Sequence, residues 1–236
     1  MTESPDDLTL VQVAWWEVDP SVLEEPGGPL APLTAHLDVT LVSEHAEQTW
    51  SRVLATPGWR LLADDSEKPT QRMAFAAPDT SAPGTWLVVL INKRNGEWQL
   101  AQLFESEAVR PGRAARRQHL SLGWPKSEFV CPAGQVPELT ATLVNRGPDD
   151  WIVGEDHLHV VAWLLDPITR EALPSDKWVA HGWVDGSQVL RPGEEVDLPV
   201  RLLTLRVEEL PLGEYGILAM VSSLNLRSEP GRLLIR

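Results

Sequence analysis

The chain has 236 residues, 43% of them hydrophobic, and carries a formal net charge of −14. This length and apolar content suffice for one large core or for two cores of ordinary size. Acidic residues outnumber basic ones 17 to six in residues 1–108 and 17 to ten in residues 119–236. Both halves therefore repel phosphate backbones, and we expect no nucleic-acid partner.

Cysteine content and hydropathy bear on the compartment. The single cysteine, Cys131, has no partner for an intramolecular disulfide. Residues 1–7 are acidic and polar, without the basic and apolar regions of an export leader, and no run approaches the ~20 apolar residues of a membrane span. We therefore expect a cytoplasmic protein with no membrane partner. Export is the alternative, because many disulfide-free sandwich domains are secreted.

The first half of the chain reads as a series of short strands. Residues 8–17 alternate until Asp19-Pro20 ends the run, and residues 24–32 are rich enough in Pro and Gly to predict a loop. The further predicted strands begin at Leu37 and cover residues 70–77, 85–91 and 97–104. The run over 85–91 is apolar on both faces, as in a central strand, and Asn95-Gly96 predicts a tight hairpin after it.

One pattern occurs in both halves. Residues 37–50 and 139–151 share Leu-x-(Val/Ala)-Thr-Leu-Val-(Ser/Asn), followed by a polar turn and Trp. Two further pairs of segments match in the same order: residues 11–16 with 119–125, and 83–89 with 212–218. We therefore predict one unit that occurs twice, with extra residues in the second copy that form an added hairpin within 165–193.

The segment that follows Ser43 is ambiguous. Ser43 is a favourable N-cap for a short helix that would end near Ala55. We predict a strand after Trp50 instead, because the matching segment of the second half reads as a strand.

A short basic segment lies between the two halves. Four of the 20 basic residues fall within eight positions: Arg110, Arg113, Arg116 and Arg117. A solvated linker is the simpler interpretation of such a charge run, and an anion-binding strip is the alternative. The predicted organisation is a domain over 1–108, an Arg-rich linker over 109–118 and a domain over 119–236.

Four segments of the second half form a recognisable set. They are Asn145-Arg-Gly-x-x-x-Trp151, residues 159–166, Leu190-x-Pro-Gly-Glu, and Pro211-Leu-Gly-Glu-Tyr215. Together they resemble bacterial immunoglobulin-like modules, in which a tyrosine hydroxyl returns to upstream backbone at a corner, the place of Tyr215 here. Such modules are often appended to glycosyltransferases and other carbohydrate-active proteins or occur as adhesion-type repeats, and they usually bind, space or orient something else.

The first half joins this family only through its likeness to the second. It lacks Asn-x-Gly before Trp50 and has Trp86 where the second half has Tyr215. The expected fold class is all-β, with two tandem immunoglobulin-like antiparallel β-sandwiches. The eleven Trp residues fit this expectation, because Trp fills sandwich cores and also supplies flat stacking surfaces.

No motif in the sequence names a reaction. There is no Gly-rich phosphate loop, Gly-x-Ser-x-Gly elbow, paired-Cys site or His-Glu-x-x-His. Cys131 has no base near it in the sequence and reads as a small buried hydrophobe rather than a nucleophile. We therefore expect no catalytic residue and no cofactor.

One pair of histidines has a spacing found among metal ligands. His157 and His159 are two apart, which on a strand places them on one face roughly 7 Å apart. A zinc site needs further ligands from another strand, for which His181 and Asp185 are the nearest. Exposed or locally hydrogen-bonded histidines explain the pair more simply, so His157 and His159 are weak metal candidates.

The strand that ends near residue 165 predicts an apolar outer face. Its core face would hold Leu158, Val160, Ala162 and Leu164. If a strand over 178–184 pairs with it, a Trp/His patch results, whose candidate members are His159, Trp163, His181 and Trp183. We favour a seam with the first domain or a second subunit; docking of a partner protein and stacking of a sugar ring are the alternatives.

These features predict a non-catalytic interaction or scaffold protein, a component of a larger assembly. Its partner would be another protein or a second copy of the chain, and exposed edge strands would add backbone pairing as a route of association. A carbohydrate-binding accessory protein with a glycan ligand is the alternative. A metal-dependent enzyme centred on His157 and His159 is the third hypothesis.

Overall fold

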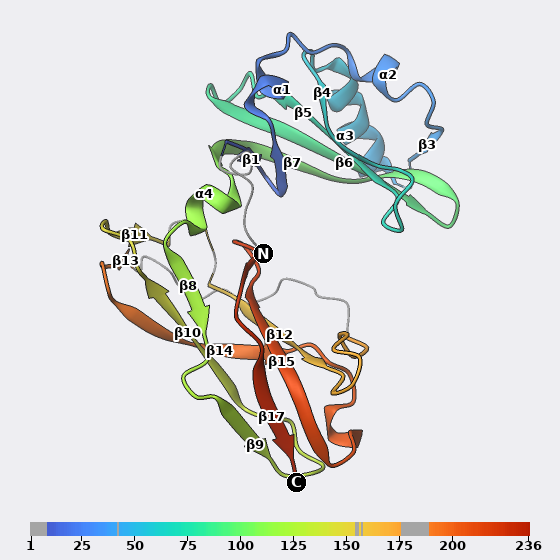
Figure 1. The fold of residues 1–236 in the computed structure, drawn as a ribbon. Coiled ribbons are helices and arrows are strands. Elements are labelled where there is room, and N and C mark those ends of the chain that lie inside the picture. Colours follow the sequence, from blue (N-terminus) through green and yellow to red (C-terminus); the bar gives the residue numbers. More distant parts are fainter. Residues whose placement is uncertain (1–8, 42, 154–155, 157, 176–188) are drawn as a thin grey trace. The chain divides into compact units, whose positions relative to one another are not determined.

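The computed structural model describes residues 9–41, 43–153, 156, 158–175 and 189–236 (Figure 1). Strands hold 48% of the residues and helices 13%, and most strand pairs are antiparallel, so the chain is predominantly β, as predicted. Two compact units divide it, unit 1 ending at Ala115 and unit 2 beginning at Arg116. The helices are α1 (Pro20–Glu24), α2 (Leu30–Leu33), α3 (Glu44–Ala55) and α4 (Arg113–Arg117), with a 3-10 turn, η2 (Val207–Glu209).

Unit 1 is built on one seven-stranded sheet. Its strands are β1 (Val11–Val13), β2 (Trp16–Val18), β3 (Val39–Thr40), β4 (Arg60–Asp65), β5 (Arg72–Pro78), β6 (Thr85–Arg94) and β7 (Glu97–Pro111). The order is β2-β1-β7-β6-β5-β4, and β3 also pairs with β7, in parallel. The strand predictions that concern β5, β6 and β7 are confirmed in position.

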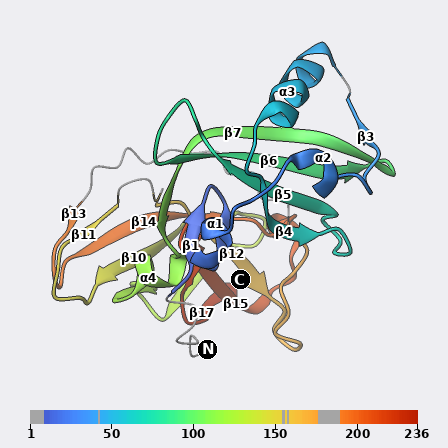
Figure 2. The ribbon, with the colours of Figure 1, turned by 90° about the horizontal axis from the view of Figure 1, so that it is seen from above.

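Both faces of this sheet are covered. Phe75 and Val89 lie in one cluster with Val53 of α3, and the adjacent residues Ala76 and Val88 lie in a second cluster on the opposite face. The β1–β2 hairpin joins that second cluster, while α3 lies alongside β7 (Figure 2). Strand β6 is therefore buried on both faces, which confirms the central strand predicted from its apolar run.

The hairpin between β6 and β7 is confirmed in detail. Arg94 pairs with Glu97, which leaves Asn95 and Gly96 as a two-residue loop. Their φ angles are +52° and +89°, the left-handed values that such a turn requires and that Asn and Gly tolerate best.

Helix α3 corrects the strand predicted after Trp50. The Oγ of Ser43 accepts a hydrogen bond from the backbone N–H of Ala46 at 3.1 Å, so Ser43 does cap a helix. Val53 is fully buried, and its carbonyl accepts from the Trp59 indole N–H at 2.9 Å. Burial of the Val53 side chain stabilises the helix by on the order of 1.5–3 kcal/mol. The segment therefore forms a helix, although its match with the second half suggested a strand.

The two copies of the sequence pattern do not fold alike. The first copy contains β3, which pairs with β7 in parallel, and the start of α3, whereas the second gives a longer strand between two antiparallel neighbours. The described strands of unit 1 belong to one sheet with helices over it, rather than to the two packed sheets predicted for the first domain. A short helix, α2, also replaces part of the loop predicted over 24–32.

Unit 2 consists of strands with little helix. They are β8 (Leu120–Gly123), β9 (Glu128–Cys131), β10 (Leu139–Asn145), β11 (Trp151–Ile152), β12 (Val160–Leu165), β13 (Val189–Leu190), β14 (Glu195–Leu202), β15 (Gly213–Val221), β16 (Leu226–Arg227) and β17 (Gly231–Ile235). One sheet has the order β8-β10-β14-β12-β15-β17-β9, with β16 paired to β15, and β11 pairs only with β13. Two of its pairs, β12 with β14 and β9 with β17, are parallel.

One hydrophobic cluster fills unit 2. Leu122 of β8 and Phe129 of β9 both belong to it, although these strands stand at opposite ends of the pairing order. Because a flat sheet would hold its two edge strands far apart, the strands of unit 2 must fold over to enclose a single core. The Tyr215 hydroxyl donates to the Pro211 carbonyl at 3.0 Å, which confirms the predicted return of this side chain to upstream backbone.

Part of the predicted extra hairpin lies within the described residues. Leu165 bridges to Ala172 across a turn in which the N–H of Asp166 donates to the Glu171 carbonyl at 2.8 Å. The remainder, residues 176–188, lies outside the described residues.

Candidate functional site: a groove between helix α3 and strand β7

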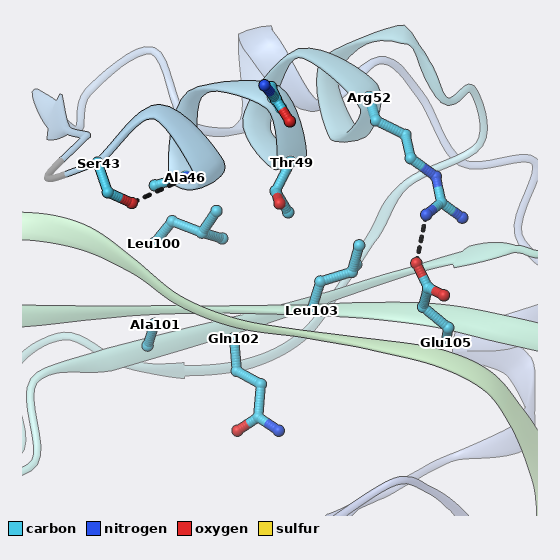
Figure 3. A pocket seen from close by; sticks show the side chains of 10 residues that line it. Ser43, Ala46, Thr49, Arg52, Leu100, Ala101, Gln102, Leu103 and Glu105 are labelled. Carbon is cyan, nitrogen blue, oxygen red and sulfur yellow. Dashed lines mark hydrogen bonds and ion pairs between the residues drawn. The ribbon is translucent and has the colours of Figure 1, made fainter.

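A concave surface in unit 1 lies between α3 and β7 (Figure 3). It has a volume of about 600 Å³, within the range of ligand and peptide sites. We call it the α3–β7 groove and define it by its lining residues: Ser43, Ala46, Gln48, Thr49, Arg52, Leu100, Ala101, Gln102, Leu103 and Glu105.

The α3 wall is made mainly of short side chains. Ser43, Ala46, Thr49 and Arg52 follow one another at intervals of three, a row that runs obliquely across a helix surface. The first three are small, so the helix stands over β7 without filling the space between them (Figure 3). The opposite side of the helix, which includes Val53, packs into the core.

The floor of the groove is apolar and is supplied by β7. Leu100 and Leu103 point toward α3, are partly buried and pack against the core of unit 1 (Figure 3). Residues three apart on a regular strand would lie on opposite faces, but the register with β6 shifts at Ala101, where Ile91 pairs with Leu100 and Leu90 with Gln102. This β-bulge turns both leucines to the same face.

The groove reaches the backbone edge of β7. The side chain of Gln102 points away from α3 (Figure 3), yet this residue and Ala101 line the groove together with their neighbours. Strand β3 pairs with β7 only at Trp98 and Gln99, and β1 only from Val109 onward. Among the described residues, no strand pairs with residues 100–106 on this edge.

An ion pair closes one end of the groove. The Arg52 guanidinium on α3 donates to the Glu105 carboxylate on β7 (Figure 3). The two side chains are 50% and 52% exposed, so solvent screens the pair and it contributes on the order of 0–1 kcal/mol. Such a contact exchanges readily for one with a ligand.

The Trp/His patch predicted in the second half is described only in part. His181 and Trp183 lie outside the described residues, as does His157. The predicted core face is confirmed, because the four residues at positions 158, 160, 162 and 164 are at most 2% exposed. On the outer face, Val161 is also buried and Trp163 is half-buried.

His159 is a partly buried histidine. Its Nε2 is shielded from solvent and has no hydrogen-bond partner among the described residues. Desolvation, and secondarily the positive charge of Arg201, lower the pKa of this imidazole from its ordinary value, so it is neutral at physiological pH. Among the described residues, no three His, Cys, Asp or Glu side chains converge on a possible metal position.

The arginines of the predicted linker correct the expectation of a solvated segment. Arg116 pairs with Asp156 at 2.8 Å, with the two side chains only 12% and 6% exposed. Arg113 pairs with Glu17 at 2.8 Å, and the Arg117 guanidinium donates to the Leu224 carbonyl at 2.6 Å. Each of these arginines thus contacts a residue that is distant in sequence. The three arginines lie in α4, and residues 109–111 belong to β7.

Cys131 is confirmed as a buried side chain. It is 3% exposed, and its thiol lies 3.3 Å from the Gln135 carbonyl. Burial raises the pKa of the thiol, which disfavours the reactive thiolate.

Asn145 has a structural role that its place in the sequence pattern does not reveal. Its Nδ2 donates to the carbonyls of Asp149 and Leu190, each at 2.8 Å, and its Oδ1 accepts from the N–H of Gly147 at 2.8 Å. The side chain is buried, so it holds the turn after β10 against β13.

No family model and no curated protein sequence matches the chain. Among the described residues, no helix is long and apolar enough to cross a bilayer.

The α3–β7 groove is the functional candidate that sequence reasoning missed. The available signal was the cap at Ser43 followed by Ala46 and Thr49, which marks a helix with a row of small side chains. Its partner surface on β7 depends on where β1 and β3 pair, and no local pattern specifies that.

Proposed function

We propose that the chain is a non-catalytic interaction protein, a component of a larger protein assembly, and that it contacts its partner at the α3–β7 groove. The observation that carries the proposal is the coincidence of an apolar floor, Leu100 and Leu103, with an edge of β7 that no described strand covers. A sheet edge beside a helix offers both backbone hydrogen bonds and side-chain subsites to a protein segment.

Unit 2 has a supporting structural role in this proposal. We take it to be an immunoglobulin-like sandwich formed by β8-β10-β14 and β12-β15-β17-β9. Support comes from the single core that these strands enclose, the Tyr215 corner, and the parallel pairing of β9 with β17. Modules of this architecture commonly position other parts of an assembly.

Site-specific photo-crosslinking tests the proposal. A benzophenone amino acid at Gln48, which lines the groove, is compared with the same group at Ser51, which is exposed on α3 outside the lining. Irradiation in the native cells should give a discrete adduct from position 48 that is absent from position 51. Equal labelling from the two positions, or none from position 48, would refute a binding role for the groove.

A further inference from the structure

We propose that the occupant of the α3–β7 groove is a short, extended, positively charged segment of a partner protein, which adds to the free edge of β7 as a further strand. This inference rests on the proposed function and specifies the partner's chemistry.

The free edge is a gap between two strands that pair on the same side of β7. Strand β3 ends its pairing at Gln99 and β1 begins at Val109. A segment placed between them along residues 100–106 would continue the sheet and satisfy backbone groups that no described strand pairs on this side. The groove gives such a segment a floor and a wall.

The gap limits the segment to about five residues. On the opposite edge of β7, Ile91 of β6 pairs with Leu100 and Val88 of β6 pairs with Phe104. Because β7 is bulged, a neighbouring strand needs fewer residues than β7 to span the same length. Register shifts at Ala101 and between Phe104 and Glu107 interrupt the edge, and Ser106 adopts a φ of +55°. Bulges of this kind prevent long regular pairing, which disfavours a second copy of β7 and leaves room for a short peptide.

Side chains of an added strand would alternate between two environments. Those that point to the α3 side would meet Leu100 and Leu103 below and the small side chains of Ala46 and Thr49 above, which suits aliphatic residues of moderate size. Those that point to the other side would extend away from α3, as Gln102 does (Figure 3).

Charge favours a basic segment. Residues 1–115, which form unit 1, hold 17 acidic and eight basic residues, so unit 1 attracts cations and repels anions at long range. Arg52, which is the basic member of the groove lining, already faces the Glu105 carboxylate. A lysine or arginine in the segment would compete with Arg52 for the Glu105 carboxylate. An acidic residue would instead meet Arg52, whose charge Glu105 already neutralises.

Selection of peptides on the full chain tests this inference. A phage library of random heptapeptides is panned on the immobilised protein, and enriched peptides are synthesised for fluorescence anisotropy. The expected peptides carry net positive charge with aliphatic residues at alternate positions. Methylation of their backbone nitrogens should abolish binding at every second position only, because a strand directs alternate N–H groups toward β7.

Two groove variants, each with a matched control, connect the peptides to the groove. Thr49→Arg fills the groove from α3 and should lower affinity at least about tenfold, while Ser51→Arg on the same helix should not. Glu105→Arg should weaken binding of basic peptides, while Glu97→Arg, at the exposed start of β7, should not. Circular dichroism establishes that each variant is folded.

Several outcomes would overturn the inference. They are acidic or uncharged consensus peptides, affinity unchanged by Thr49→Arg in a folded protein, insensitivity to backbone methylation, or no enrichment at all. In each case a position-48 crosslink to a folded partner surface would leave the proposed function standing. A crosslinked adduct of twice the chain's mass would identify a second copy as the occupant and would also contradict a basic peptide.

Discussion

Removal of the Asn145 side chain should destabilise unit 2 by an amount that its contacts define. The buried amide makes three hydrogen bonds, two through Nδ2 and one through Oδ1, all at 2.8 Å. At about 1 kcal/mol for each, Asn145→Ala should cost about 3 kcal/mol, and the loss rises if the buried Leu190 carbonyl finds no other partner. A loss of this size is a large fraction of the stability of a domain.

Hydrogen exchange followed by mass spectrometry resolves this effect within unit 2. A loss of about 3 kcal/mol should accelerate exchange of the most protected β10 and β14 amides about 100-fold. Thr142→Ala is the matched control on the same strand, because its Oγ1 donates to the exposed Asp197 carboxylate and its removal should cost on the order of 0.5 kcal/mol. Acceleration by Asn145→Ala no greater than that of the control would refute the structural role assigned to Asn145.

Three further predictions concern stability and reactivity. Burial lowers the pKa of His159 in the folded chain below its ordinary value of about 6.5. Between these two pKa values the unfolded chain binds more protons than the folded chain does. Unit 2 should therefore lose stability as the pH falls from 7 through this interval. His159→Gln should flatten the pH dependence measured by urea unfolding, and an unchanged slope would contradict it. Ser43→Ala should cost α3 about 1 kcal/mol, seen as about fivefold faster exchange of its first-turn amides, with Ser51→Ala as the exposed control whose effect should be smaller. The Cys131 thiol should react with a disulfide reagent at pH 8 far more slowly in the native chain than in urea, and equal rates would show that it is accessible.

Local patterns were sufficient for the parts of the fold that are set locally. Asn95-Gly96 predicted the β6–β7 hairpin because few other residues accept its backbone angles, and the apolar run before it predicted a strand covered on both faces. The alternation over 158–164 likewise assigned the core face of β12, and the position of Tyr215 predicted its hydrogen bond.

The match between the two halves gave a wrong prediction where it was preferred to the local helix signal. Ser43 carried a correct helix signal, but the match between residues 37–50 and 139–151 favoured a strand. Short patterns of alternating apolar residues recur in unrelated β-rich units because they report only half-burial, so they do not specify which strands pair. The single sheet of unit 1 with its helices follows from long-range pairing that the pattern does not encode.

Long-range contacts also determine the arginines and the groove. Arg116 reads as a solvated cation in the sequence, and only the fold brings Asp156 to it. The groove similarly requires β1 and β3 to pair with opposite ends of β7 while α3 covers Leu100 and Leu103. A sequence pattern reports which side chains tend to be buried, but not which strand edge remains uncovered.

Affinity purification with paired variants tests the central claim, that the α3–β7 groove binds a protein partner. Tagged full-length chains with Thr49→Arg or Ser51→Arg are expressed at equal levels in the native cells, purified, and compared by quantitative mass spectrometry. A stoichiometric partner should co-purify with the Ser51→Arg chain and be depleted from the folded Thr49→Arg chain. Equal recovery with both variants would contradict that claim.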